Sequence, residues 1–138
     1  MVADAGLTLH HGAGLMVSGM TREHVARWGK AGALYDLVAS IAFVTPWTGA
    51  LVLELLGTPH TKETLLFSTL FGTVVVMWSI VRWLRPEPLL IAADTAGRAL
   101  FSLWFAWALW NGHTPALAGF LVLELFWGAA QLRALVRR

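Results

Sequence analysis

Cysteine is absent from this chain of 138 residues, and charged residues are scarce. The lack of cysteine excludes disulfide bonds, thiol redox chemistry and thiolate metal sites. Charged residues make up 13% of the sequence, whereas an average soluble domain has about 25%. The sequence also lacks a Gly-rich phosphate loop, an HExxH motif and a GxSxG motif. Catalytic residues therefore stay unassigned, and we predict neither a cofactor nor a metal site.

Apolar residues dominate instead, with 57% hydrophobic residues and a mean hydropathy of +0.65. Four stretches are apolar and about as long as the roughly 20 residues that a bilayer-spanning helix needs. They cover residues 33–56, 64–84, 89–111 and 116–136. The pI near 9.7 reflects a small basic excess at the ends of these stretches, which suits anionic lipid head groups. The predicted partner is the lipid bilayer, and nothing indicates nucleic-acid binding.

Two segments precede the first apolar stretch. Residues 1–20 lack the basic start and unbroken apolar block of a signal peptide, so we expect a flexible tail. The adjacent His10 and His11 fall in that tail, where a solvated position is favoured over a metal-ligand pair. Residues 21–30 carry three basic side chains and a tryptophan, which indicates a short helix in the membrane interface. We predict that residues 21–138 form one membrane domain.

Proline residues mark two breaks in the helical pattern. Pro46 lies inside the first apolar stretch and removes a backbone donor, which predicts a kink in that helix. The sequence Arg-Pro-Glu-Pro at 85–88 forms a tight turn between the second and third stretches, because two prolines cannot continue a helix.

The basic residues favour four crossings over three. With four crossings, eight basic residues fall on one side of the membrane and only Lys62 on the other. The eight are Arg22, Arg27, Lys30, Arg82, Arg85, Arg133, Arg137 and Arg138. The positive-inside rule assigns that side to the cytoplasm. We therefore predict an all-α protein, a four-helix antiparallel transmembrane bundle with a cytoplasmic N-terminus and C-terminus and a first helix kinked near Pro46.

Charged residues interrupt the third and fourth stretches. Asp94 and Arg98 lie one helical turn apart on one face. Counting a rise of about 1.5 Å per residue puts Arg98 and Glu124 at nearly the same depth, which predicts a contact between them. The same counting brings Asp36 and Gln131 near the level of Asp94. Because charges at such depth need partners, we expect these five residues to form one connected set.

Three interpretations of this set stay open. In the first it is structural, and fixes helix register in a non-catalytic accessory subunit or self-associating protein. In the second the five residues bind a small apolar molecule, such as a lipid or quinone, in a binding protein or an enzyme. That interpretation requires a cavity of about 300 Å³ or more touching Asp94, Arg98 or Glu124. The third is a proton-coupled transporter, with a water-accessible route from both faces to Glu124.

A resemblance to a known family rests on the second half of the chain. The second stretch ends in VRWLRPEP, the third contains ADTAGRALFSLWFAWALWNG, and the fourth contains FLVLELFWGAAQL. With Asp94, Gly97 and Arg98 in the third stretch, residues 30–136 resemble small bacterial four-helix inner-membrane proteins of the DoxX-like kind. The resemblance implies a multi-pass protein of the bacterial inner membrane. It also implies a place in a larger membrane complex for some members, as non-catalytic subunits, and supplies no catalytic residue.

Overall fold

The structure is a computed structural model that describes the backbone of residues 5–137 and the side chains of residues 22–137. Over this range the chain is all-helical and contains no strand. Its elements are α1 (Ala5–Ser40), the short 3-10 helix η1 (Ile41–Phe43), α2 (Pro46–Leu55), α3 (Lys62–Leu84), α4 (Pro88–Trp110) and α5 (Leu117–Val136). The side chains of the predicted tail, including His10 and His11, lie outside the described residues.

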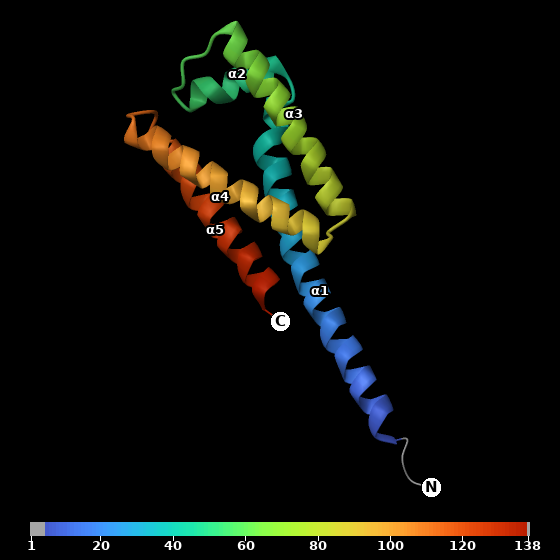
Figure 1. Ribbon diagram of the computed structural model, residues 1–138. Coiled ribbons are helices and arrows are strands. Elements are labelled where there is room, and N and C mark those ends of the chain that lie inside the picture. Colours follow the sequence, from blue (N-terminus) through green and yellow to red (C-terminus); the bar gives the residue numbers. More distant parts are fainter. Residues whose placement is uncertain (1–4, 138) are drawn as a thin grey trace.

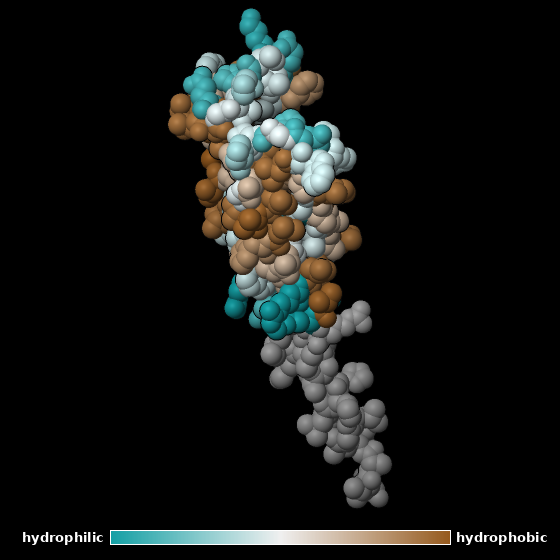
Figure 2. Space-filling model, turned by 90° about the vertical axis from the view of Figure 1, so that its left-hand side faces the viewer, coloured by the Kyte–Doolittle hydropathy of each residue, from teal (hydrophilic) through white to brown (hydrophobic). Residues whose placement is uncertain are grey.

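Three helices, α3, α4 and α5, are long and apolar enough to cross a membrane. A fourth crossing is obtained if α1 from Arg22 and α2 count together as one bent span. The space-filling view shows an apolar belt between two hydrophilic ends (Figure 2). Large apolar side chains such as Phe67 and Trp107 are 70% and 56% exposed, as expected where lipid covers them. These are the properties of a multi-pass membrane protein.

The predicted spans agree with the helices to within two residues for α3, α4 and α5. The first predicted span differs, because α1 ends at Ser40 and α2 turns away from it by 101°. Proline disfavours helical geometry in the preceding residue, and Thr45 is extended, with φ −122° and ψ 147°. Its hydroxyl then accepts a hydrogen bond from the Thr48 amide at 3.3 Å and caps α2. The kink predicted near Pro46 is therefore a complete break.

The helices pack as two pairs (Figure 1). α3 lies along α1, and α4 lies along α5, while α1 also contacts α4 and α5. α3 and α4 share the turn at 85–87 but diverge from it, and their backbones hardly approach each other. α2 lies across the end of the bundle next to α3. The backbones of the two pairs therefore lie farther apart at the end where α2 lies (Figure 1).

Glycine allows α1 to approach the second pair closely. A Cβ atom at Gly29 would lie 2.2 Å from Cδ1 of Ile91, and one at Gly32 would lie 2.6 Å from Nε2 of Gln131. A small core of Val25, Ile91 and Ala134 forms where these helices meet. The residues 21–30, predicted as a separate interfacial helix, are part of the continuous α1, and Val25 among them belongs to this core.

Candidate functional site

Arg98 lies at the centre of a buried charge cluster to which four helices contribute. Its Nη1 donates to Oε2 of Glu124 on α5 at 3.0 Å, and its Nη2 donates to Oδ2 of Asp36 on α1 at 2.6 Å. Its Nε donates to Oδ2 of Asp94, one turn back on α4, at 3.1 Å. Only 2% of the Arg98 surface is exposed. One guanidinium group therefore joins three carboxylates from three helices, and the predicted contact between Arg98 and Glu124 is present.

Arg82 on α3 is the second cation of the cluster, although it was not predicted as a member of the connected set. It is fully buried and donates to Asp36 and to Asp94. Arginine suits this position because its planar, rigid fork of donors can serve two carboxylates at once. The sequence did carry a signal, since Arg82 lies on the same helical face as Ser79 and Gly72, which are also buried. We define the charge cluster as Asp36, Arg82, Asp94, Arg98 and Glu124.

Asp94 is the most fully bonded carboxylate of the charge cluster. Besides both arginines, its Oδ2 accepts a hydrogen bond from Nε2 of Gln131 at 2.9 Å. Its Oδ1 accepts one from the indole of Trp78 at 3.1 Å. Gln131 is itself fully buried. Both oxygens of Asp94 are thus satisfied by protein groups, as a buried carboxylate requires.

The five residues predicted as one connected set do form one. Asp36, Asp94, Arg98, Glu124 and Gln131 are linked by hydrogen bonds and ion pairs. The two contributors from α3, Arg82 and Trp78, were not in that set. Whether the set binds a ligand remains a prediction, since the contacts alone serve a structural role equally well.

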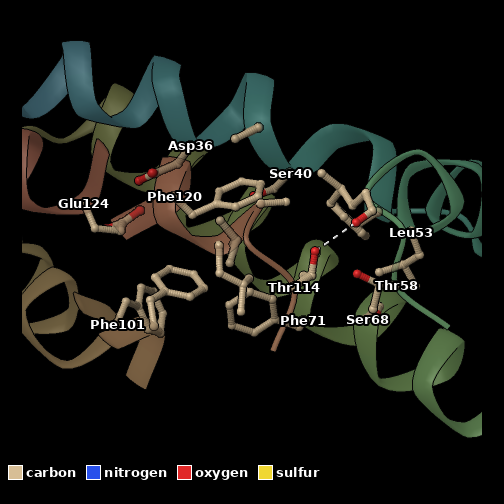
Figure 3. A pocket seen from close by; sticks show the side chains of 18 of the residues that line it. Asp36, Ser40, Leu53, Thr58, Ser68, Phe71, Phe101, Thr114, Phe120 and Glu124 are labelled. Carbon is tan, nitrogen blue, oxygen red and sulfur yellow. Dashed lines mark hydrogen bonds between the residues drawn. The ribbon is translucent and has the colours of Figure 1, made fainter. Parts of the chain in front are cut away.

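A cavity of about 330 Å³ adjoins the charge cluster on the side toward α2 (Figure 3). Most of its wall is apolar, and aromatic rings from α1, η1, α3, α4 and α5 contribute to it. These are Tyr35, Phe43, Phe71, Phe101, Phe105 and Phe120. Tryptophan side chains, which the sequence contains in abundance, do not line it. We call this cavity the aromatic pocket.

The two ends of the aromatic pocket differ in chemistry. Figure 3 shows the carboxyl groups of Asp36 and Glu124 together at one end. At the other end the pocket reaches the segments that connect the helices, where the Thr114 hydroxyl donates to the Leu56 carbonyl at 3.2 Å. Leu53 of α2 also lines the pocket, so α2 covers this end. The pocket is therefore apolar along its length and acidic at its inner end.

A second cavity of about 200 Å³ lies between the diverging helices α3 and α4. Val75 and Phe101 line both cavities, and so do the carboxylates Asp36 and Glu124. Gly97 lines the second cavity, and a Cβ atom there would meet no heavy atom within 4 Å. Both cavities therefore reach the carboxylates at the acidic end of the aromatic pocket, one from the side of α2 and one from between α3 and α4.

Two carboxylate oxygens at this end have no partner among the described residues. Oδ2 of Asp36 accepts from both arginines and Oε2 of Glu124 accepts from Arg98, whereas Oδ1 of Asp36 and Oε1 of Glu124 accept no hydrogen bond. Three carboxylates also face two guanidinium groups across the charge cluster. With every group ionised, one negative charge is left over.

Over the residues that the structure describes, no group of three or more His, Asp or Glu side chains could hold a metal ion. Comparisons with models of protein families, with curated proteins and with solved structures yield no match to this chain. The chemistry of the site must therefore be argued from its own groups, which offer hydrogen-bond acceptors, a negative charge and an apolar wall.

Proposed function

We propose that this protein is a membrane-embedded binding protein for a small, mostly apolar molecule with a polar end. The observation that carries the proposal is the aromatic pocket, whose volume of about 330 Å³ falls in the usual range for ligand sites and which touches Glu124. A purely structural charge cluster requires no cavity beside it. An apolar wall with a few convergent polar groups is the common composition of small-molecule sites.

We further propose a four-crossing bundle with both termini in the cytoplasm. The segment from Arg22 to Phe43, which comprises the second half of α1 and η1, spans about 33 Å at about 1.5 Å per residue, comparable to the hydrocarbon core of about 30 Å. In this topology α2 lies at the outer end and covers the aromatic pocket. Basic residues then gather at the opposite end, where Arg22 lies near Pro86 of the turn between α3 and α4. The resemblance to DoxX-like proteins supports the same topology and an inner-membrane location.

The absence of cysteine makes this topology directly testable. Single cysteines at the exposed positions Glu63, Glu87 and Arg137 report on the two ends of the bundle. In intact bacterial cells, a membrane-impermeant maleimide should label Glu63→Cys alone. Glu87→Cys and Arg137→Cys should react only after the membrane is opened. Labelling of Arg137→Cys from outside would contradict four crossings with a cytoplasmic C-terminus.

The accessory-subunit interpretation remains the second candidate. The connected charge cluster supports it, because such contacts fix helix register in any membrane bundle. It predicts that the aromatic pocket has no occupant of its own. A proton-coupled transporter is the third candidate, and it additionally requires a water-accessible route from both faces to Glu124.

Filling the aromatic pocket separates these candidates. Ala39 lines the pocket, whereas the neighbouring Val38 is 69% exposed on the outside of α1. We expect Ala39→Phe to abolish saturable binding of the neutral probe naphthylmethanol and Val38→Phe to leave it unchanged. Equilibrium dialysis between protein-containing and empty zwitterionic nanodiscs measures the bound probe. Equal binding by the two variants, or no saturable binding by the natural sequence, would contradict the proposal.

A further inference from the structure

The two oxygens without partners indicate what the polar end of the ligand is. Oδ1 of Asp36 and Oε1 of Glu124 accept no hydrogen bond from the described residues, and both side chains line the aromatic pocket (Figure 3). Glu124 is only 8% exposed overall, but neither of these two oxygens is fully buried, so both are accessible from the pocket. A carboxylate oxygen can only accept hydrogen bonds, so a matching ligand group must donate them.

The charge balance adds an independent argument. Asp94 is bonded through both oxygens, and each arginine already donates to two or three carboxylates. The charge that is left over therefore lies on the pair Asp36 and Glu124, at the end of an apolar pocket. A surplus negative charge beside an apolar wall is unfavourable, and a cationic partner at this point would balance it.

We propose that the aromatic pocket binds a small amphipathic cation, with a protonated amine or amidine between Asp36 and Glu124 and its apolar body against the phenylalanine rings. The inference rests on the proposed function and names its ligand class. A cation is also attracted to the faces of aromatic rings, and Phe101 and Phe120 lie next to the two carboxylates in Figure 3. A neutral lipid or quinone would bring no positive charge to this end of the pocket.

A matched pair of probes tests this inference. Naphthylmethylamine and naphthylmethanol have the same ring and similar size, but only the amine is cationic at neutral pH. In the dialysis experiment with zwitterionic nanodiscs, we expect the amine to bind at least about tenfold more tightly than the alcohol, because hydrogen bonds to charged groups are the stronger ones. Equal affinity would overturn the cation inference and leave the proposed function standing. Absence of saturable binding by either probe would overturn both.

Glu124→Gln shows whether the preference arises at the acidic end. The amide oxygen can still accept the hydrogen bond from Arg98, but the surplus charge is lost. We expect the variant to lose the preference, so that it binds the amine no more tightly than the alcohol. A persistent preference for the amine would overturn the inference.

A tethered cation provides a second variant that does not depend on Glu124→Gln folding. Val75 lines both cavities beside Asp36 and Glu124, whereas Met77 on the same helix is 63% exposed on the outside. We expect Val75→Lys to fold, because its ammonium group can reach the oxygens without partners, and to bind no amine. Met77→Lys should reduce folded protein, since its charge faces lipid. If Val75→Lys folds and binds the amine as the natural sequence does, or if it accumulates as poorly as Met77→Lys, the inference fails.

Discussion

Replacement of Arg82 by methionine tests whether charge balance or contact number determines the stability of the bundle. Arg82 is fully buried and forms ion pairs with Asp36 and Asp94, so it joins α3 to α1 and α4. Methionine keeps the apolar volume of the arginine stem and removes the guanidinium group. Three carboxylates then face Arg98 alone, and the surplus negative charge rises from one to two.

Two magnitudes compete in this variant. Loss of interhelical hydrogen bonds inside membranes costs about 0.6 kcal/mol on average and at most about 1.7 kcal/mol. Leaving a buried charge without its partner costs about 3–5 kcal/mol. Arg82 leaves behind two carboxylates that are 12% and 8% exposed, so the second effect should dominate. We expect Arg82→Met to lower the free energy of unfolding by about 3–5 kcal/mol.

The double variant Arg82→Met with Asp94→Asn restores the original surplus of one negative charge. Its asparagine oxygen can take the position of Oδ2 and still accept from Arg98, whereas the NH2 group in the position of Oδ1 cannot accept from Trp78. We therefore expect the double variant to be more stable than Arg82→Met alone, although it has lost more ionic contacts. Titration of the helical circular dichroism signal with SDS in mixed micelles measures both free energies. If Arg82→Met loses less than about 1 kcal/mol, or if the two substitutions add independently, the reasoning from charge balance is refuted.

Two further predictions concern the helix packing at Gly72 and the start of α3. A Cβ atom at Gly72 would lie 2.5 Å from Cβ and 2.9 Å from the carbonyl carbon of Phe43, whereas one at Gly97 would meet nothing within 4 Å. Gly72→Ala should therefore destabilise the protein by about 1–3 kcal/mol, and Gly97→Ala should not, both judged by the same SDS titration. Thr61 and Thr64 form a reciprocal capping box at the start of α3, so Thr61→Ala should cost about 1 kcal/mol. Faster amide hydrogen exchange in the first turn of α3 would report the lost cap, and unchanged exchange would contradict its role.

The positions of α3, α4 and α5 follow from the sequence, because long apolar runs bounded by charged residues and proline can hardly form anything but membrane-spanning helices. The contact between Arg98 and Glu124 was also predicted correctly, because in a straight helix the depth of a residue in the membrane follows from its position in the sequence. Arg82 was left out of the predicted set, because it lies two residues before the end of α3 and so resembles a flanking charge. Its burial depends on Asp36, 46 positions away in sequence, and on the direction in which α1 passes.

Neither the complete break after α1 nor the aromatic pocket was predicted, and the reasons differ. The pair Thr45 and Pro46 is both a helix stop and a capped helix start, so the signal for a break was present in the sequence. No comparable feature of the sequence indicated the aromatic pocket. Its rings come from five elements, and its volume depends on how far α3 diverges from α4, which is a property of the assembled bundle.

The spacing of the acid and base on α4 has a consequence for biogenesis. Asp94 and Arg98 are one turn apart and bonded to each other, so this segment can leave the translocon with its own charge already neutralised. α3 and α5 each bring only one member of the charge cluster, Arg82 and Glu124. Asp94→Asn should therefore impair insertion of α4, because the guanidinium group of Arg98 then enters the membrane without its own carboxylate and before Glu124 of α5 has been synthesised.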